Sequence, residues 1–338
     1  MSGGEPPGRK ASGQATSDDE HIDDHGVMTI LPATLEVRHA SRRIGDRLVL
    51  NEVSLEVGRG RIVAVTGPNG AGKTSLMRAV AGRLRLDGGS VSVEGLSPAE
   101  ARHRGRLGIV PQDIALYSHL TVRENLSVLA RLSGVGAAVL GARVDEGLAW
   151  AGLADRASAL THTLSGGMRR RANLVAGVLH RPALLLLDEP TVGVDAESES
   201  RLHTLLRSLR DNGMGLLVST HNLDEAAAIC DDVVVMHQGR VLAHGSLAEI
   251  VTRAFSDGRE LAVSVEAGPD GSARALEAEG FRQAGGHTWV RSASHSLADL
   301  GATEQRLLAA GVRVAEARLR EPSLRGAIAV LTGTAEVS

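Results

Sequence analysis

The chain has 338 residues, of which 43% are hydrophobic, and its formal net charge is -3. This length predicts about two domains with a large buried core, and the charge offers nucleic acid no overall basic field. The single cysteine, Cys230, excludes an internal disulfide framework and a multi-cysteine zinc site, so we expect it to be a small buried hydrophobe.

Residues 1–30 are rich in Gly, Ser, Pro, Asp and Glu, which predicts a disordered N-terminal tail. Met28 also allows a shorter start of translation. The longest pure apolar runs, such as ALLLL at 183–187, are far shorter than the roughly 20 residues of a membrane-spanning helix. The N-terminus lacks a secretory signal pattern, and we therefore expect a cytoplasmic protein.

Residues 31–255 alternate strand-like apolar runs with helical patterns, which predicts an α/β core with a parallel sheet and some antiparallel additions. The runs are LEVRH, VSLEV, RIVAV, LGIV, ALLLLD, GLLVST and DVVVMH. Residues 256–338 read differently, with short strands and helices in alternation such as ELAVSV, ARALEAEGF and HTWVRS. They predict a second, small α+β domain, in which Trp289 packs the interior.

The most informative motif is GPNGAGKT at 67–74, which follows the run RIVAV and precedes the helical pattern SLMRAVAGRL. It fits the P-loop pattern, in which glycines let backbone N–H groups point at phosphate oxygens near a helix N-terminus. Lys73 is one of only two lysines among 37 basic residues. Its compact charge suits a site with little room, whereas a glycine-rich turn without a ligand leaves the Lys-Thr pair unexplained. The predicted nucleotide-binding residues here are Gly67, Pro68, Asn69, Gly70, Ala71, Gly72, Lys73, Thr74 and Ser75.

Two carboxylates end the apolar run LLLLDEP at 184–190. We expect Asp188, with the Thr74 hydroxyl, to hold Mg²⁺, and Glu189 to point the other way and polarise a water for attack on a γ-phosphate. An acidic turn at a strand end is the alternative.

Two further strand ends carry single polar residues. Gln112 in VPQD could reach Mg²⁺ or the attacking water, and His221 in VSTHN could bind the γ-phosphate. Taken alone, a glutamine or histidine at a strand end is more often a solvated polar residue.

The segment LSGGMRRR at 164–171 places Ser165 before an apolar-periodic helix, which it can cap. Gly166 and Gly167 let backbone amides approach an anion closely. A helix cap alone leaves these paired glycines without a reason.

In this order, GPNGAGKT, Gln112, LSGGM, LLLLDEP, Asp195 and His221 closely resemble the nucleotide-binding subunit of ABC transporters over residues 35–250. The resemblance implies the ABC-type ATPase fold with a helical subdomain, ATP and Mg²⁺ as cofactors, and ATP hydrolysis that drives transport. Glu189 would be the catalytic base and His221 the γ-phosphate sensor.

The resemblance also implies partners. In this family the P-loop of one subunit faces the LSGGM of another, so Ser165, Gly166, Gly167 and Asp195 would complete the ATP site of a second copy in a homodimer or pseudo-dimer. A separate transmembrane permease would bind near Arg123 and Glu124, which holds the chain at the inner face of the cell membrane. Thr121 and Glu124 also fit an ordinary capping box.

Two segments concern how the adenine base binds and which molecules are transported. The family's usual adenine-stacking aromatic is replaced by Ile44 in SRRIGDRLVL, so adenine would rest on Ile44, Arg42 or Arg43 and bind less strongly. The ending REPSLRGAIAVLTG resembles the tail of daunorubicin-resistance ATPases, which implies export of drug- or antibiotic-like molecules. A dimer-stabilising appendage is the alternative for this tail.

The alternative function is a soluble ABC-type ATPase acting on nucleic acid or ribosomes. The chain lacks the zinc cysteines, long heptad insertion or second cassette that such proteins carry. We therefore expect no nucleic-acid partner.

Overall fold

The computed structural model describes residues 20–22, 28–30, 33–255, 259–266, 272–293 and 297–333. The chain divides into two compact units, residues 1–32 and 33–338. In the first, the strands β1 (Glu20–Ile22) and β2 (Met28–Ile30) pair antiparallel. The remainder of the predicted tail lies outside the described residues, so its disorder stays a prediction.

A six-stranded sheet forms the centre of the second unit. Its strands are, in spatial order, β11 (Arg240–Gly245), β10 (Asp232–His237), β5 (Ile62–Thr66), β9 (Gly215–Ser219), β8 (Leu184–Asp188) and β7 (Leu107–Val110). All neighbours are parallel except β11, which pairs antiparallel with β10. The predicted parallel sheet with antiparallel additions is confirmed.

The apolar runs of this sheet are buried because both faces are covered. Along β8, Leu185 and Leu187 join one core cluster, while Leu184 and Leu186 join another on the opposite face. This alternation follows from the two-residue period of a strand.

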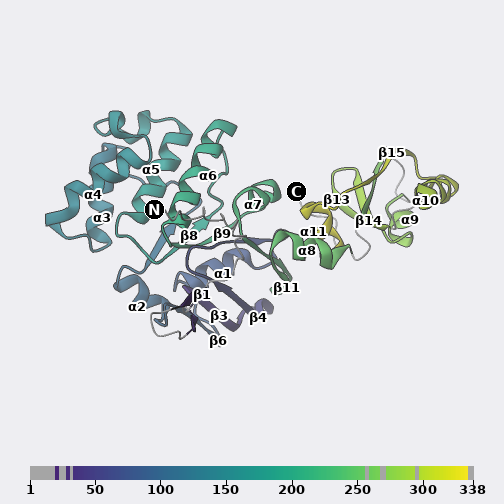
Figure 1. The fold of residues 1–338 in the computed structure, drawn as a ribbon, viewed down its shortest axis with the longest axis horizontal. Helices are drawn as coiled ribbons and strands as arrows, with labels where there is room; N and C mark the ends of the chain where they lie inside the picture. Colours follow the sequence, from purple (N-terminus) through teal and green to yellow (C-terminus); the bar gives the residue numbers. More distant parts are fainter. Residues whose placement is uncertain are drawn as a thin grey trace, which may run out of the picture. The chain divides into compact units, whose positions relative to one another are not determined.

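Helices and a second sheet cover the two faces. A three-stranded antiparallel sheet of β4 (Arg47–Val57), β3 (Leu35–Ile44) and β6 (Gly88–Val93) shares its core with α1 (Lys73–Val80). In Figure 1 the helices α3, α4, α5 and α6 form a separate teal group. The helices of this part of the chain, with two short 3₁₀ turns, are α2 (Pro98–His103), α3 (Val122–Leu132), α4 (Ala137–Trp150), η1 (Ala154–Arg156), η2 (Thr161–Thr163), α5 (Gly166–Val178), α6 (Ala196–Asp211) and α7 (Leu223–Ile229). The capping box of Thr121 and Glu124 is present at the start of α3.

The residues after 255 build a four-stranded antiparallel sheet flanked by helices. In spatial order the strands are β13 (Arg282–Gly285), β14 (Thr288–Ala293), β12 (Arg259–Val265) and β15 (Val314–Arg320), and the helices are α9 (Ser272–Ala278) and α10 (Leu297–Ala309). Trp289 packs in the core of this sheet, as predicted, and Phe281 lies in the same cluster. The strand β13 was not predicted, because it has no apolar run.

The last helix, α11 (Leu324–Thr332), packs against α8 (Leu247–Ala254). Leu324 and Ile328 share one buried cluster with Ile250 and Phe255. The tail therefore returns to the part of the chain that holds the parallel sheet, and the boundary at 255/256 stays a prediction. Within the described ranges, no helix is both long and apolar enough to cross a membrane.

Candidate phosphate-binding active site

The GPNGAGKT segment forms the loop between β5 and α1 at the carboxyl end of the central sheet. Gly67 has φ 144°, and a Cβ atom there would lie 2.1 Å from the carbonyl oxygen of Met236, so no other residue fits without moving backbone. The Lys73 Nζ donates hydrogen bonds to the carbonyl oxygens of Gly67 (2.6 Å) and Pro68 (3.2 Å). The carbonyl oxygens of the loop thereby hold the ammonium group of Lys73 in place.

The charge of Lys73 is set by two opposing effects. Burial lowers the pKa of Lys73, and the negative charges of Glu189 and Asp188 oppose this shift. Phosphate oxygens would add further negative charge and favour the protonated amine.

A pocket of about 500 Å³ opens above this loop. Its lining residues are Arg47, Val49, Asn69, Gly70, Ala71, Gly72, Lys73, Thr74, Ser75, Gln112, Glu189 and His221. Most of the predicted nucleotide-binding loop, Gln112, Glu189 and His221 thus meet in one place, although they lie far apart in the sequence. Gly67, Pro68 and Asp188 lie next to the pocket in sequence but do not line it.

Glu189 and His221 form a close pair at the ends of β8 and β9. The His221 Nδ1 lies 2.5 Å from the Glu189 Oε2, and the Glu189 N–H donates to the Ser219 carbonyl oxygen at 3.0 Å. Glu189 has φ 48°, a conformation that is uncommon for a residue with a side chain and that marks many functional sites. The pair can orient a water and exchange a proton with it.

Asp188 is turned to a different partner. Its carboxylate accepts a short hydrogen bond from the Ser219 hydroxyl, so the two adjacent carboxylates of LLLLDEP diverge. Sequence reasoning missed Ser219, which only the pairing of β8 with β9 brings to Asp188.

The oxygen atoms of Thr74, Gln112 and Asp188 are of the kind that Mg²⁺ prefers. No group of three or more His, Cys, Asp or Glu side chains in the described part of the chain could hold a metal ion. Thr74, Gln112 and Asp188 could supply part of a Mg²⁺ shell, and phosphate oxygens could supply the rest. Their role as metal ligands stays a prediction.

Arg47 and Val49, on β4, are pocket residues that the sequence did not indicate. The Arg47 guanidinium donates to the Gly70 carbonyl oxygen at 2.7 Å, whereas Ile44 is 51% exposed. Arg42 and the Arg43 backbone N–H instead bind Asp87. The arginine that lines the pocket is thus Arg47, and neither Arg42 nor Arg43 lines it. The sequence could have indicated Arg47, because it pairs with Ile44 across the hairpin turn.

Ser165 caps α5, because its hydroxyl accepts a hydrogen bond from the Met168 N–H at 3.2 Å. Asp195 caps α6 in the same way and also accepts from the Ser198 hydroxyl at 3.0 Å. None of Ser165, Gly166, Gly167 and Asp195 lines the pocket of its own chain. Their contact with a nucleotide stays a prediction.

Gly167 corrects one step of the sequence argument. A Cβ atom there would lie 2.0 Å from the Ser198 Oγ on α6, so close packing within the chain already requires glycine. At Gly166 the nearest atom to such a Cβ is 3.8 Å away, an ordinary contact distance. Of the two glycines, only Gly166 is left without a packing reason.

Comparisons with known proteins point to one family. Residues 50–192 match the family described as "ABC transporter". The chain is 40% identical over 216 residues to the Nod factor export ATP-binding protein I of Burkholderia lata, covering 63% of this chain and 71% of that protein. It is 38% identical over 244 residues to the daunorubicin resistance ATP-binding protein DrrA3 of Streptomyces coeruleorubidus, covering 72% and 77% of the two chains.

A solved structure of an ATP-binding subunit of an ABC transporter has the same fold. It superposes with a TM-score of 0.60 and 32% sequence identity, over 65% of this chain and 92% of that one. The phosphate-binding loop, Gln112 and Glu189 lie within the residues matched by the family, whereas Arg47, Val49 and His221 lie outside them.

Proposed function

We propose that this chain, which belongs to the ABC transporter family as an ATP-binding subunit, drives the export of drug- or antibiotic-like molecules through a separate membrane permease. It is an ATPase whose hydrolysis is coupled to transport. The observation that carries the proposal is the meeting of Lys73, Glu189 and His221 in one pocket at the end of the parallel sheet.

In the proposed reaction, the loop amides and Lys73 bind the β- and γ-phosphates of ATP. Thr74, Gln112 and Asp188 would hold Mg²⁺, which neutralises phosphate charge when bound. Glu189 positions a water for attack on the γ-phosphate and accepts its proton. The imidazole of His221, 2.5 Å from Glu189, keeps this carboxylate oriented and lies where it can donate to a phosphate oxygen.

The site is proposed to be completed by a second copy of the chain. Ser165, Gly166 and Asp195 are absent from the lining of their own pocket, as expected if they serve a partner's nucleotide. ATP would then bridge two chains, and its hydrolysis would let them separate, so that the chain alternates between closed and open dimers.

The proposal on cargo is supported by the names of two relatives. The name of one similar protein describes resistance to daunorubicin, and that of another describes export of Nod factor. We propose that the permease holds the chain at the inner face of the cell membrane and contacts it near Arg123 and Glu124, at the start of α3.

The catalytic assignment is tested with Glu189→Gln. In the full-length chain with ATP and Mg²⁺, this variant should hydrolyse ATP at least ~100-fold more slowly and accumulate as a dimer in size-exclusion chromatography with light scattering. Glu146→Gln, at an exposed residue of α4, is the control and should behave like the unmodified chain. A Glu189→Gln variant that stays monomeric with ATP and hydrolyses it normally contradicts the proposal.

The partner class is tested by isolating the tagged chain from its own cells. Recovery with a polytopic membrane protein supports the permease, whereas recovery only with ribosomes or DNA overturns the exporter proposal.

A further inference from the structure

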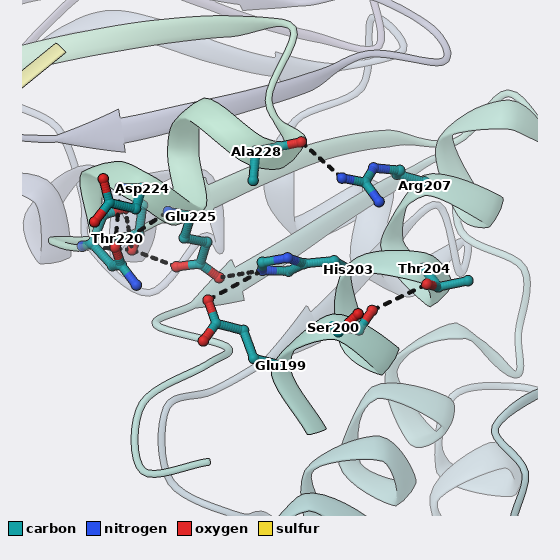
Figure 2. A network of polar contacts seen from close by, with 10 residues as sticks. Glu199, Ser200, His203, Thr204, Arg207, Thr220, Asp224, Glu225 and Ala228 are labelled. Atoms are coloured by element: carbon teal, nitrogen blue, oxygen red, sulfur yellow. Dashed lines mark hydrogen bonds and ion pairs between the residues drawn. The ribbon is translucent and has the colours of Figure 1, made fainter. Parts of the chain in front are cut away.

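A buried carboxylate, that of Glu225, contacts Thr220, which directly precedes the pocket residue His221. Glu225, on α7, is 1% exposed, and its Oε2 accepts a hydrogen bond from the Thr220 hydroxyl at 2.6 Å. Figure 2 shows this carboxylate between Thr220 on one side and His203 on the other. Burying a carboxylate is costly unless it is paired or hydrogen-bonded, so its position calls for a physical reason.

Thr220 directly precedes His221 and is itself 2% exposed. Its hydroxyl donates to Glu225 and accepts from the Asn222 N–H at 3.0 Å, so one oxygen atom ties both neighbours of His221. The Thr220 N–H donates to the Val65 carbonyl oxygen at 3.1 Å, at the end of β5. The segment that carries His221 is therefore anchored on two sides.

His203, on α6, faces the other oxygen of Glu225. Its Nε2 lies 3.9 Å from the Glu225 Oε1 and 3.7 Å from the Glu199 Oε1. Neither His203 Nε2 nor Glu225 Oε1 has a hydrogen-bond partner among the residues that the structure describes. The imidazole of His203 therefore faces both carboxylates.

We propose that Thr220 and Glu225 are positioning residues, which hold His221 against Glu189, and that His203 packs beside Glu225 and helps to fix its carboxylate. This rests on the proposed roles of Glu189 and His221 at the γ-phosphate. The carboxylate fixes the Thr220 hydroxyl, the hydroxyl fixes the backbone around His221, and the imidazole then meets Glu189 at 2.5 Å. A small displacement of His221 would misalign the pair without changing the phosphate-binding loop.

The first test removes only the hydroxyl. In the full-length chain, Thr220→Val should lower kcat for ATP hydrolysis about tenfold while the Kd for ATP, measured with a fluorescent analogue, changes less than about twofold. Thr220→Ser retains the hydroxyl and should restore at least half of the rate. Thr204→Val, at an exposed position of the same helix as His203, removes a hydroxyl that donates to the Ser200 carbonyl oxygen and should leave both constants unchanged.

The second test addresses the carboxylate. Glu225→Gln should also lower kcat with little effect on ATP affinity, whereas Asp224→Asn, the exposed neighbour on α7, should not. Replacing His203 by Gln should lower the unfolding temperature more in the unmodified chain than in the Glu225→Gln background, because the second chain lacks the carboxylate that His203 faces.

Glu189→Gln separates the two proposals. If that variant is inactive while Thr220→Val and Glu225→Gln hydrolyse ATP at the normal rate, the positioning role is wrong and the active site stands. If Glu189→Gln hydrolyses ATP normally, the proposed function itself fails. Loss of ATP affinity in parallel with kcat in Thr220→Val, or no recovery in Thr220→Ser, would indicate a general structural defect and would also overturn the positioning role.

Discussion

Arg47, which lines the pocket, could replace the aromatic side chain that is missing at the position of Ile44. Ile44 is half exposed and does not line the pocket. The lining residues include neither Phe, Tyr nor Trp. Arg47 offers a planar guanidinium that can stack on a base, and its bond to Gly70 holds it at the loop that would bind the phosphates. We therefore propose that the base side of the site depends on Arg47, in a chain whose only two lysines are Lys10 and Lys73.

Arg47→Ala should weaken ATP binding by about 0.5–2 kcal/mol, because a stacked cation contributes on that scale. The measurement is an equilibrium titration with ATP and, separately, with GTP. Arg43→Ala is the matched control, since its guanidinium donates to the Asp46 carbonyl oxygen away from the pocket. Weaker binding in the Arg43 variant alone would instead support the expectation drawn from the sequence.

At the scale of elements, the start of α5 and the start of α6 are packed together through Gly167 and Ser198. The Ser198 hydroxyl also binds Asp195, which caps α6, so this contact couples the LSGGM segment to the cap. A glycine inside a helix is normally unfavourable relative to alanine, which makes the close approach the reason for its presence.

Gly167→Ala should destabilise the chain by about 1–3 kcal/mol, because the new methyl group overlaps both the Oγ and the Cβ of Ser198. Urea unfolding measures this change. Gly166→Ala is the control, and we expect it to leave the unfolding free energy equal or slightly higher, since its surroundings are open. Adding Ser198→Gly to the Gly167 variant should recover stability, and a variant without any loss would refute the packing argument.

At the scale of the whole molecule, a buried acid joins the C-terminal sheet to the last helix. Glu260, on β12, is 0% exposed and accepts hydrogen bonds from the Arg320 Nε (2.8 Å), the Ser323 N–H (2.8 Å) and the Ser323 hydroxyl (2.9 Å). Ser323 in turn caps α11, which lies on α8. Ser323, in the ending REPSLRGAIAVLTG, therefore has a structural role in docking α11.

Glu260→Ala should lower stability by about 2–4 kcal/mol and release α11, because the Ser323 N–H and Arg320 lose their buried acceptor. Urea unfolding and increased binding of a hydrophobic dye to the exposed face of Leu324 and Ile328 measure this. Glu316→Ala, an exposed acid on β15, is the control. If this variant unfolds in a single transition, the residues after 255 and the ATPase core unfold as one unit. Two transitions would support a domain boundary at 255/256.

The sequence by itself determined the five parallel strands of the central sheet, the glycine-rich loop at 67–74 and the caps of α3 and α5, whereas β11 was not predicted. Runs such as LLLLD are apolar enough to be buried on both faces, and Ser165 and Thr121 act on amides within three residues of themselves. These features depend on local backbone chemistry, which a stretch of sequence contains in full.

Only the tertiary structure decided which distant residues meet. Ser219 reaches Asp188 because β9 lies between β5 and β8, Arg47 reaches the pocket because its sheet passes beside the loop, and Gly167 is constrained by Ser198 on another helix. The same holds for His203, Glu225 and Thr220, which come from two helices and a strand end. Such contacts depend on strand order and helix packing, and these follow from the burial of the whole core rather than from any one segment.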